Sequence, residues 1–575
     1  MSKKIVIIGG VAAGPKAACR LKRLQPDWDI TVIDQDNLIS YGGCGIPYYV
    51  CGDVSDEQEL RSTSFHMLRD ESFFANAKGV TVMTRTRALG IDRRARTVQI
   101  ENLDSGKKSD IAYDKLMLST GARPFVLPIP GADLDGVFTI SDLHKAIEIK
   151  ERIAHGRVGK AVVIGGGAIG VEMAEALTDL WGIETTLLEF MPQLLPRIVD
   201  WQFAAMLKAH LEEKNIPVHT DESATEIVGN DDGGVVAVKT ARRTIDADMV
   251  IMAVGVRPRS ELAAEAGLLV EPWGGIVVNH RLQTSDPDIY AAGDCIASTN
   301  LVTGKKTFAP LGSLANREGR IVADNMAGRV STFNGVVGSF IMKAFDRCIG
   351  ATGISYETAV AEGFDADYAL TAPSDRAHFF PGEAIVVFQM VFDRGTRKVL
   401  GLQGFGVMND SVSVRIDTAA ALIAKGATID DFTTVEMAYA PPFSAAIDSL
   451  NAVAFVADNL CAGLLLKVGM DRFLAWMDDS SREADWVVLD IRHPKETAPF
   501  VEKFGRDKWV AVPYPEIRSR YEELPADKTM IILCDAGTRS FEVQVFLRHI
   551  GKKNTLVLSG GFNVIRRIGA DWLPR

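Results

Sequence analysis

Residues 161–170 read Ala-Val-Val-Ile-Gly-Gly-Gly-Ala-Ile-Gly, and this stretch decides the fold. Four apolar residues predict a buried parallel strand, and the glycines that follow fit the strict pattern GxGxxG. Such glycines let the backbone approach a pyrophosphate at a helix N-terminus, where free amides attract it. The three glycines of the pattern are Gly165, Gly167 and Gly170.

A second strand, 185–188, ends on Glu189, which lies 19 residues beyond Gly170. A carboxylate at this place suits a free ribose 2′-hydroxyl and repels a 2′-phosphate. The segment 161–189 therefore predicts a domain that binds NADH in preference to NADPH.

A looser copy of the same pattern opens the chain. The apolar run 5–8 leads into Gly9 and Gly14, and a second strand, 30–33, ends on Asp34. Val11 stands where the strict pattern has its central glycine. Two dinucleotide folds in one chain are typical of FAD in the first and a nicotinamide in the second.

Three further segments fit this arrangement: 116–124 and 252–258 are apolar strands that enter glycine turns, and 284–294 is a strand that ends on an acid. In this order the motifs resemble the pyridine nucleotide-disulfide oxidoreductase family over about residues 1 to 450. The resemblance implies an FAD domain interrupted by an NADH domain, followed by a dimerisation domain, and therefore a homodimer. It also implies that Asp294 holds the FAD ribityl chain. The further candidates are Thr120 and Gly121 for FAD and Gly255 for NADH.

Composition limits the other possibilities. The 575 residues suggest three or four domains, and a net charge of −11 argues against nucleic acid as the main partner. Seven cysteines without metal-ligand spacing predict no metal site and a reducing, cytoplasmic location. The sequence contains no run of 18 apolar residues, so we expect no membrane span.

Cys44 is the candidate redox centre of the flavin half. It lies in Ile-Ser-Tyr-Gly-Gly-Cys-Gly-Ile-Pro-Tyr-Tyr (39–49), and the position five residues later is Tyr49, so the CxxxxC pair is absent. A lone cysteine here resembles the coenzyme A-disulfide reductase and NADH oxidase/peroxidase branch. Such a thiolate takes its resolving sulfur from the substrate or is oxidised to a sulfenic acid.

The same branch implies further site residues. Tyr439, in Tyr-Ala-Pro-Pro-Phe-Ser, resembles the tyrosine that reaches the partner subunit's active site and protonates a leaving thiolate. A second tyrosine expected near 378–382 is replaced by phenylalanine, and Gly43 replaces a polar residue common in the branch. Coenzyme A requires cations for its phosphates. Its candidate residues are Arg20, Arg23, Arg61 and Ser40.

The last hundred residues begin a new α/β pattern. A strand at 486–489 is followed by Asp490-Ile491-Arg492, and a strand at 530–533 leads into Cys-Asp-Ala-Gly-Thr-Arg-Ser (534–540) and a helix to His549. A cysteine between a strand end and a helix start, near an arginine, favours a reactive thiolate. The segment resembles the rhodanese family, and by that likeness Cys534 carries a persulfide that Arg539 stabilises.

The expected fold class is therefore α/β, with two nested Rossmann-like dinucleotide-binding domains, an α+β dimerisation domain and a C-terminal rhodanese-like α/β domain. The predicted ranges are 1–150 and 281–330 for the FAD domain, 151–280 for the NADH domain, 331–452 for the dimerisation domain, 453–475 for a linker and 476–575 for the rhodanese domain.

The combination resembles rhodanese-fused coenzyme A-disulfide reductases and predicts an enzyme with FAD, NADH and coenzyme A. We expect it to reduce persulfides or polysulfides, including coenzyme A persulfide, at Cys44, with Cys534 carrying sulfane sulfur. Three alternatives stay open: a plain coenzyme A-disulfide reductase, an NADH oxidase or peroxidase, and a redox-sensing or sulfur-delivering partner protein.

Overall fold

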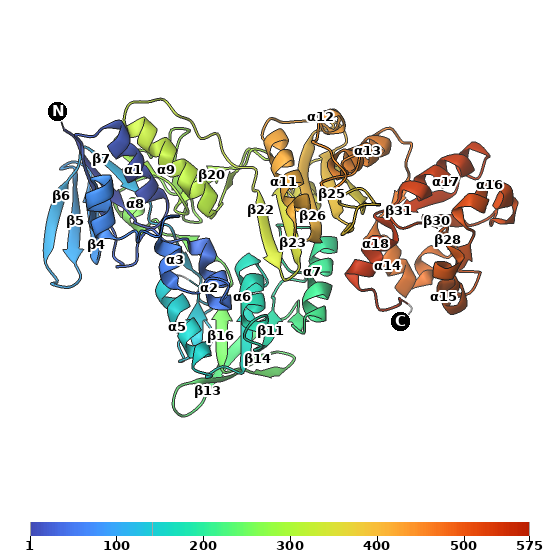
Figure 1. The fold of residues 1–575 in the computed structure, drawn as a ribbon, viewed down its shortest axis with the longest axis horizontal. Coiled ribbons are helices and arrows are strands. Elements are labelled where there is room, and N and C mark those ends of the chain that lie inside the picture. Colours follow the sequence, from blue (N-terminus) through green and yellow to red (C-terminus); the bar gives the residue numbers. More distant parts are fainter. Residues whose placement is uncertain (1, 141, 574–575) are drawn as a thin grey trace. The chain divides into compact units, whose positions relative to one another are not determined.

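The computed structural model describes residues 2–140 and 142–573. Positions 1 and 141, in the predicted range 1–150, and positions 574 and 575, in the predicted range 476–575, lie outside the described residues. The chain forms two compact units (Figure 1). The first unit holds the residues up to Pro192 together with His219–Val336, and the second holds Gln193–Val218 together with the residues from Val337 onward.

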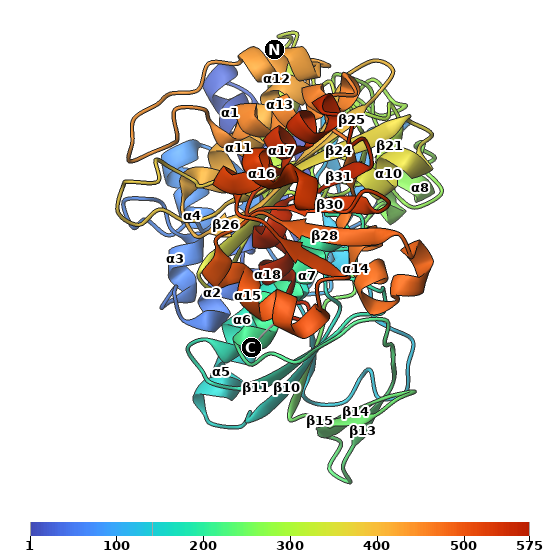
Figure 2. The same cartoon turned by 90° about the vertical axis from the view of Figure 1, so that its right-hand side faces the viewer.

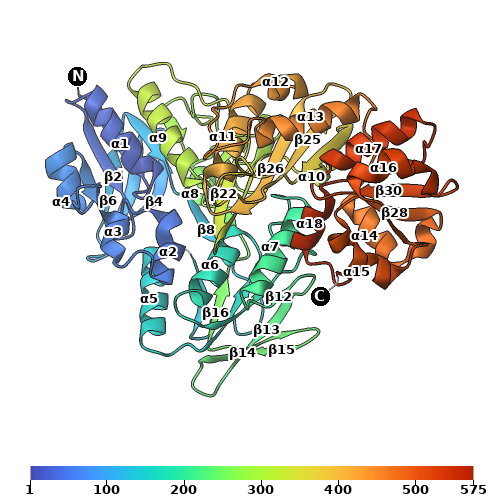
Figure 3. The ribbon, with the colours of Figure 1, turned by 45° about the vertical axis from the view of Figure 1, so that its right-hand side comes forward.

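A parallel sheet of five strands forms the N-terminal part of the first unit, in the order β19-β7-β1-β2-β3. Strands β1 and β2 confirm the two strands predicted around the first glycine loop, and helix α1 (Ala13–Leu24) joins them. Helix α1 lies beside α9 (Gly312–Met326), which comes from the end of the unit (Figure 3). The strands are β1 (Lys4–Ile8), β2 (Asp29–Ile33), β3 (Thr81–Met83), β7 (Lys115–Leu118) and β19 (Ile289–Ala291).

The second parallel sheet of this unit carries the strict glycine pattern. Strands β11, β10, β16 and β9 lie side by side in that order, and α6 (Ala168–Thr178) follows β10. The chain enters this sheet after β7 and returns to the first sheet at β19, so the second domain is nested within the first, as predicted. The strands are β9 (Val137–Thr139), β10 (Lys160–Ile164), β11 (Glu184–Leu188) and β16 (Met249–Met252).

Two of the predicted glycine-turn segments meet where the chain crosses between these sheets. Strand β8 (Ala122–Pro124) pairs antiparallel with β17 (Val256–Pro258). Gly121 and Gly255 directly precede them and have φ angles of +69° and +100°, which L side chains adopt rarely. The crossing therefore depends on both glycines.

Short elements complete the first unit. Helix α2 (Ile46–Cys51) packs against α6 and α5 (Leu143–Ala154). Besides the β8–β17 pair, three-stranded sheets of the described residues lie outside the two main ones: β4 (Thr86–Asp92), β5 (Thr97–Asn102) and β6 (Lys108–Ala112); β13 (Ala224–Gly229), β14 (Val235–Thr240) and β15 (Thr244–Asp246); and β18 (Ile276–Val277), β20 (Ile296–Thr299) and β21 (Lys306–Thr307).

The second unit contains an antiparallel sheet in the order β22-β23-β26-β25-β24. Helix α11 packs on β23 and β26, and α13 packs on β24 and β25. The elements are β22 (Phe340–Ala344), β23 (Arg347–Gly353), β24 (Ala366–Thr371), β25 (Val387–Asp393), β26 (Val399–Val407), α11 (Asp410–Ile423) and α13 (Ser449–Cys461).

A parallel sheet ends the chain, in the order β27-β31-β30-β28-β29. Helices cover both faces: α16 and α17 lie on one, and α14, α15 and α18 on the other (Figure 2). The strands are β27 (Lys467–Val468), β28 (Trp486–Asp490), β29 (Trp509–Ala511), β30 (Thr529–Leu533) and β31 (Thr555–Leu558). The helices are α14 (Met470–Asp478), α15 (Pro494–Phe504), α16 (Ile517–Arg520), α17 (Thr538–His549) and α18 (Gly561–Ile568).

The segment 453–475 is largely built into the two neighbouring sheets. Val453, Ala454 and Ala457 of α13 are buried against the antiparallel sheet, and β27 pairs with β31 of the C-terminal sheet. Only residues 462–466 lie between α13 and β27. No described helix is long and apolar enough to cross a membrane.

Candidate active site

The first glycine loop leaves no room for side chains. A β-carbon on Gly9 would lie 2.0 Å from the Ser119 carbonyl oxygen, and one on Gly14 would lie 2.0 Å from the Gly9 carbonyl oxygen. Asp34, at the end of β2, accepts a hydrogen bond of 2.6 Å from the Gly10 amide. Burial raises the pKa of Asp34. The acid thus fixes the loop that the sequence places against a pyrophosphate.

The second loop repeats this geometry. A β-carbon on Gly165 would lie 2.4 Å from the Ala253 carbonyl oxygen, and one on Gly170 would lie 1.8 Å from the Gly165 carbonyl oxygen. Glu189 is buried at the end of β11 and accepts a hydrogen bond of 2.5 Å from the Gly166 amide. Gly167 directly precedes α6. Both loops form cradles that side chains would fill, and these cradles fit a dinucleotide.

Two acids lie near the end of the first cradle, the partly buried Asp294 and the buried Glu318. Burial raises the pKa of Asp294 to about 6 and that of Glu318, on α9, to about 7. Glu318 accepts a hydrogen bond of 2.7 Å from the Gly293 amide. The Thr120 hydroxyl donates to the Arg259 carbonyl oxygen at 2.5 Å, which fixes the turn before β8. Glu318 belongs to none of the predicted motifs; its signal in the sequence is an acid on the apolar face of an amphipathic helix.

Cys44 is exposed at the start of the short helical segment that leads into α2. Its Sγ atom lies 3.3 Å from the place that a β-carbon on Gly312 would occupy, so the sulfur lies beside the first residue of α9. The N-terminus of a helix suits an anionic sulfur. Gly312 also belongs to none of the predicted motifs, although it begins a helix after an irregular segment.

The residue that replaces a second cysteine is unreactive. Tyr49 is 6% exposed, and the ammonium of Lys150 lies 3.9 Å from the centre of its ring. Burial raises the pKa of Tyr49 and, more strongly, that of Tyr41. Cys44 thus has no sulfur partner five residues along the chain, as the sequence requires.

The candidate coenzyme A residues differ in their surroundings. Arg20 pairs with Asp324 of α9 at 2.8 Å, whereas Arg23 is exposed near the end of α1. The Nε atom of Arg61 is buried without a hydrogen-bond acceptor among the described residues. Ser40 is buried at a φ of +53°, a strained conformation for a side chain. Arg61 is therefore the candidate cation with an unmet hydrogen-bonding need.

Tyr439 belongs to an exposed apolar surface of the second unit. The Ala377 amide donates to the Pro441 carbonyl oxygen at 3.4 Å, which joins the loops 374–384 and 436–447. We call the exposed side chains of these loops the aromatic patch: Phe379 (68% exposed), Tyr439 (51%), Phe443 (75%) and Ile447 (60%). Apolar side chains gathered in this way are typical of a protein interface.

Cys534 occupies the turn between β30 and α17. It is 1% exposed, and its sulfur accepts a hydrogen bond of 3.1 Å from the Gly537 amide. Gly537 has a φ of +96°, and α17 begins directly after it. Arg539 forms an ion pair with Asp535 of the same loop. The structure thus brings Cys534 and Arg539 to one helix start.

The base of this loop is rigid. Phe562 donates its amide to the Cys534 carbonyl oxygen at 2.9 Å, and a β-carbon on Gly561 would lie 2.6 Å from that oxygen. Beneath it, Arg492 donates to the fully buried Asp490 at 2.7 and 3.0 Å and lies over the ring of Phe562. The predicted segment 490–492 is therefore a buried support of the cysteine loop.

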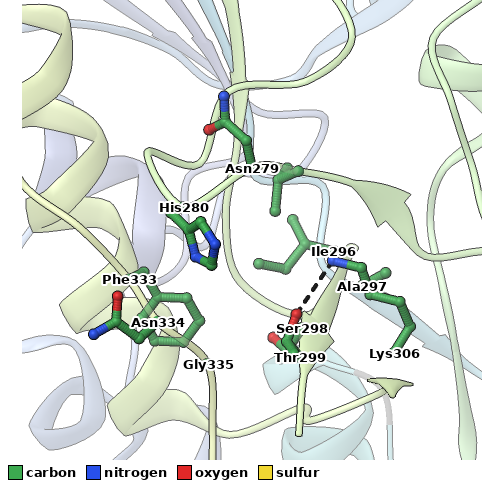
Figure 4. A pocket seen from close by; sticks show the side chains of 11 residues that line it. Asn279, His280, Ile296, Ala297, Ser298, Thr299, Lys306, Phe333, Asn334 and Gly335 are labelled. Carbon is green, nitrogen blue, oxygen red and sulfur yellow. Dashed lines mark hydrogen bonds between the residues drawn. The ribbon is translucent and has the colours of Figure 1, made fainter. Parts of the chain in front are cut away.

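Figure 4 shows a pocket of about 240 Å³ elsewhere in the first unit. Its lining includes His280, Phe333 and Lys306, whose ammonium donates to the Thr299 hydroxyl at 3.3 Å. No predicted site residue lines this pocket, and it carries none of the chemistry described here.

Two nested dinucleotide folds with a cysteine beside the first of them define an oxidoreductase that uses a pyridine nucleotide. The model of the family described as "Pyridine nucleotide-disulphide oxidoreductase" matches residues 3–313, that of its dimerisation domain matches 341–450, and that of the rhodanese-like domain matches 473–567. The chain belongs to the pyridine nucleotide-disulphide oxidoreductase family.

Relatives and a solved structure extend this result. A "NAD(P)H coenzyme A polysulfide/persulfide reductase" of Pyrococcus horikoshii is 34% identical over 79% of this chain and 98% of its own length. An "NADH oxidase" of Methanocaldococcus jannaschii is 33% identical over 78% of this chain and 98% of its own length. The structure of a NAD-dependent persulfide reductase from A. fulgidus is 37% identical, covers 98% of this chain and 99% of its own, and superimposes with a TM-score of 0.91.

Proposed function

We propose that this protein is an FAD-dependent reductase that oxidises NADH and reduces persulfides or polysulfides, including coenzyme A persulfide, at Cys44. One observation carries the proposal: Cys44 is exposed, and a buried tyrosine stands where a second cysteine would resolve its disulfides. A disulfide at Cys44 then takes its second sulfur from a substrate. The similarity over nearly the whole chain to a persulfide reductase supports this choice.

The two glycine cradles are the proposed nucleotide sites. Gly9, Gly14, Asp34, Thr120, Gly121 and Asp294 would hold FAD, and Gly165, Gly167, Gly170, Glu189 and Gly255 would hold NADH. The buried carboxylate of Glu189 favours NADH because it would repel a 2′-phosphate. When bound, FAD would transfer an electron pair from NADH to sulfur.

Cys44 performs the sulfur chemistry in this proposal. Its thiolate attacks the inner sulfur of R–S–SH, an S–S bond forms between Cys44 and R–S, and hydrosulfide leaves with the electron pair of the broken bond. The mixed disulfide is then reduced by two electrons from NADH, which frees the thiol R–SH and restores Cys44. Tyr439 of the partner subunit would donate the proton that the leaving sulfur takes.

The homodimer is part of the same proposal. The aromatic patch lies on the region that matches the dimerisation model, and it would be covered by the partner subunit. Tyr439 belongs to this patch, so dimer formation would carry its hydroxyl to the partner's cysteine.

Coenzyme A and the C-terminal domain complete the proposed cycle. Arg20, Arg23, Arg61 and Ser40 would bind coenzyme A, and Asp324 would hold the Arg20 guanidinium in place. Cys534 would carry sulfane sulfur as a persulfide that the Gly537 amide and Arg539 stabilise. A cytoplasmic setting would keep both thiols reduced.

Anaerobic NADH oxidation by the purified protein tests the proposal, with coenzyme A persulfide, coenzyme A disulfide, polysulfide and peroxide as acceptors. We expect a persulfide or polysulfide to give the highest kcat/KM and Cys44→Ser to be inactive. Cys534→Ser is the matched second thiol and should lose only the sulfur supply from the C-terminal domain. A preference for peroxide, or full persulfide turnover by Cys44→Ser, would refute the proposal.

A further inference from the structure

An acidic residue directly follows the cysteine that is proposed to carry sulfur. The side chains of Asp535 and Arg539 form an ion pair across the junction between the loop and α17. Both are partly exposed, Asp535 by 33% and Arg539 by 40%. The cation that would stabilise a Cys534 persulfide is therefore paired with a carboxylate of its own loop.

The charges of the loop disfavour a dianion. An ionised Cys534 and Asp535 oppose a single cation, Arg539, so the segment 534–539 carries about one net negative charge. Glu542, on the same helix as Arg539, accepts a hydrogen bond from the Tyr514 hydroxyl and lies outside this ion pair. A donor that brings two negative charges to its reacting group meets repulsion here, whereas a persulfide brings at most one.

We infer that Asp535 sets the donor preference of Cys534: by engaging Arg539, it makes the site select organic persulfides over thiosulfate-like dianions. This inference rests on the proposed role of Cys534 as a sulfur carrier. Asp535 acts through Arg539 and touches no reacting atom, so it is a positioning residue.

The chemistry distinguishes the two donors. The Cys534 thiolate attacks the outer sulfur of R–S–SH; a bond forms between these two sulfurs, the donor S–S bond breaks, and R–S⁻ leaves with its electron pair and takes up the persulfide proton. With thiosulfate the same attack expels sulfite, which leaves with the electron pair and two negative charges. Binding and departure of that dianion need the guanidinium that Asp535 occupies.

Sulfur transfer to cyanide by the full-length holoenzyme tests the inference, with thiosulfate and glutathione persulfide as the two donors. The readout is the ratio of their kcat/KM values for thiocyanate formation. Asp535→Asn should raise the thiosulfate-to-persulfide ratio about fivefold to tenfold, as expected for the loss of one partly screened charge. The gain should fall mainly on the KM for thiosulfate and shrink at high salt.

Two matched variants distinguish the effect of the Asp535–Arg539 ion pair from the effect of removing any nearby negative charge. Asp535→Glu keeps a carboxylate in reach of Arg539 and should keep the wild-type ratio. Glu542→Gln removes a carboxylate from the same helix but outside the pair, and should leave the ratio within about twofold. An unchanged ratio in Asp535→Asn, or an equal gain in Glu542→Gln, would overturn the inference.

Mass spectrometry of Cys534 distinguishes this failure from failure of the proposed function. If wild-type protein gains no sulfur atom on Cys534 from either donor and forms no thiocyanate, the carrier role itself is wrong. If sulfur is carried and the ratio does not respond to Asp535, only the inference about donor preference is wrong.

Discussion

The sulfur of Cys44 faces Gly312 at the start of α9: a β-carbon on Gly312 would lie 3.3 Å from Cys44 Sγ. Gly312 is the first residue of α9, so the end of that helix forms one side of the cysteine's surroundings. A methyl group there would crowd the sulfur without demanding an unfavourable backbone, since Gly312 does not have a positive φ.

Gly312→Ala should therefore lower turnover with persulfide while preserving the fold. Displacement of a nucleophile by a few tenths of an ångström, together with a methyl group beside it, should reduce kcat/KM by about 10- to 100-fold. Gly42→Ala is the matched control, because its β-carbon would meet no atom closer than 3.8 Å. Full turnover in Gly312→Ala would mean that the substrate does not approach the sulfur along α9.

Local features of the chain were predictable from the sequence. The apolar runs before the glycine loops became β1 and β10, and the run before Cys534 became β30, each within one residue of the prediction. These elements depend on burial and glycine geometry, which neighbouring residues specify.

Contacts between distant segments were not predictable. The sequence predicts Arg20 as a candidate cation for coenzyme A, and the pair that it forms with Asp324, 304 residues away, has no local signal. Gly312 and Glu318 reach the candidate site only because α9 returns to α1 from the end of the first unit. No local sequence pattern predicts that these two helices meet, because the contact depends on the tertiary packing of α1 on α9.

Glu318 predicts a pH-dependent stability. Its pKa is raised from 4.5 to about 7 by burial, so the folded state binds the proton more tightly than the unfolded state. The free energy of unfolding should fall by about 3 kcal/mol as pH rises from 4.5 to 7. Glu318→Gln keeps an acceptor for the Gly293 amide and cannot ionise. Urea unfolding should show a smaller difference in the free energy of unfolding between pH 5 and pH 8 in this variant than in wild type. An equal difference would mean that another group causes the pH dependence.

Glu189 predicts the choice of nicotinamide. Replacement of its charge in Glu189→Gln should raise the ratio of kcat/KM for NADPH to that for NADH about tenfold, because repulsion of the 2′-phosphate is lost. The amide oxygen can still accept from Gly166, so the loop should persist. Glu222→Gln serves as control, because Glu222 is a buried acid whose backbone amide donates to the Glu189 carbonyl oxygen while its carboxylate pairs with Arg243. The test measures the oxidation of NADH and of NADPH with the same acceptor. If the ratio of their kcat/KM values does not change, another residue distinguishes the two nucleotides.

The pair Lys467–Asp367 predicts an asymmetric response to mutation. The Lys467 ammonium lies 2.6 Å from the Asp367 carboxylate and 3.6 Å from the centre of the Tyr368 ring. Asp367→Ala leaves the largely buried Lys467 ammonium with only the Tyr368 carbonyl oxygen and ring beside it, and should cost about 3 kcal/mol. Lys467→Met keeps the packing, and Asp367 retains the hydrogen bond from the Tyr368 amide, so this variant should cost less than about 1 kcal/mol. Thermal unfolding of the full chain measures both. Equal losses would show that packing, and not the stranded charge, decides stability at this place.

The same lysine has a consequence for how this protein can be divided. Lys467 pairs in β27 with the C-terminal sheet while its ammonium is bound to β24 of the antiparallel sheet. The match to the rhodanese-like model begins only at residue 473, beyond this strand. A fragment that begins there lacks the edge strand β27 and exposes the unpaired edge of β31, so the rhodanese-like domain cannot be separated at that residue without loss of strand pairing. A fusion that transfers this domain to another protein must include β27 and a partner for the Lys467 ammonium.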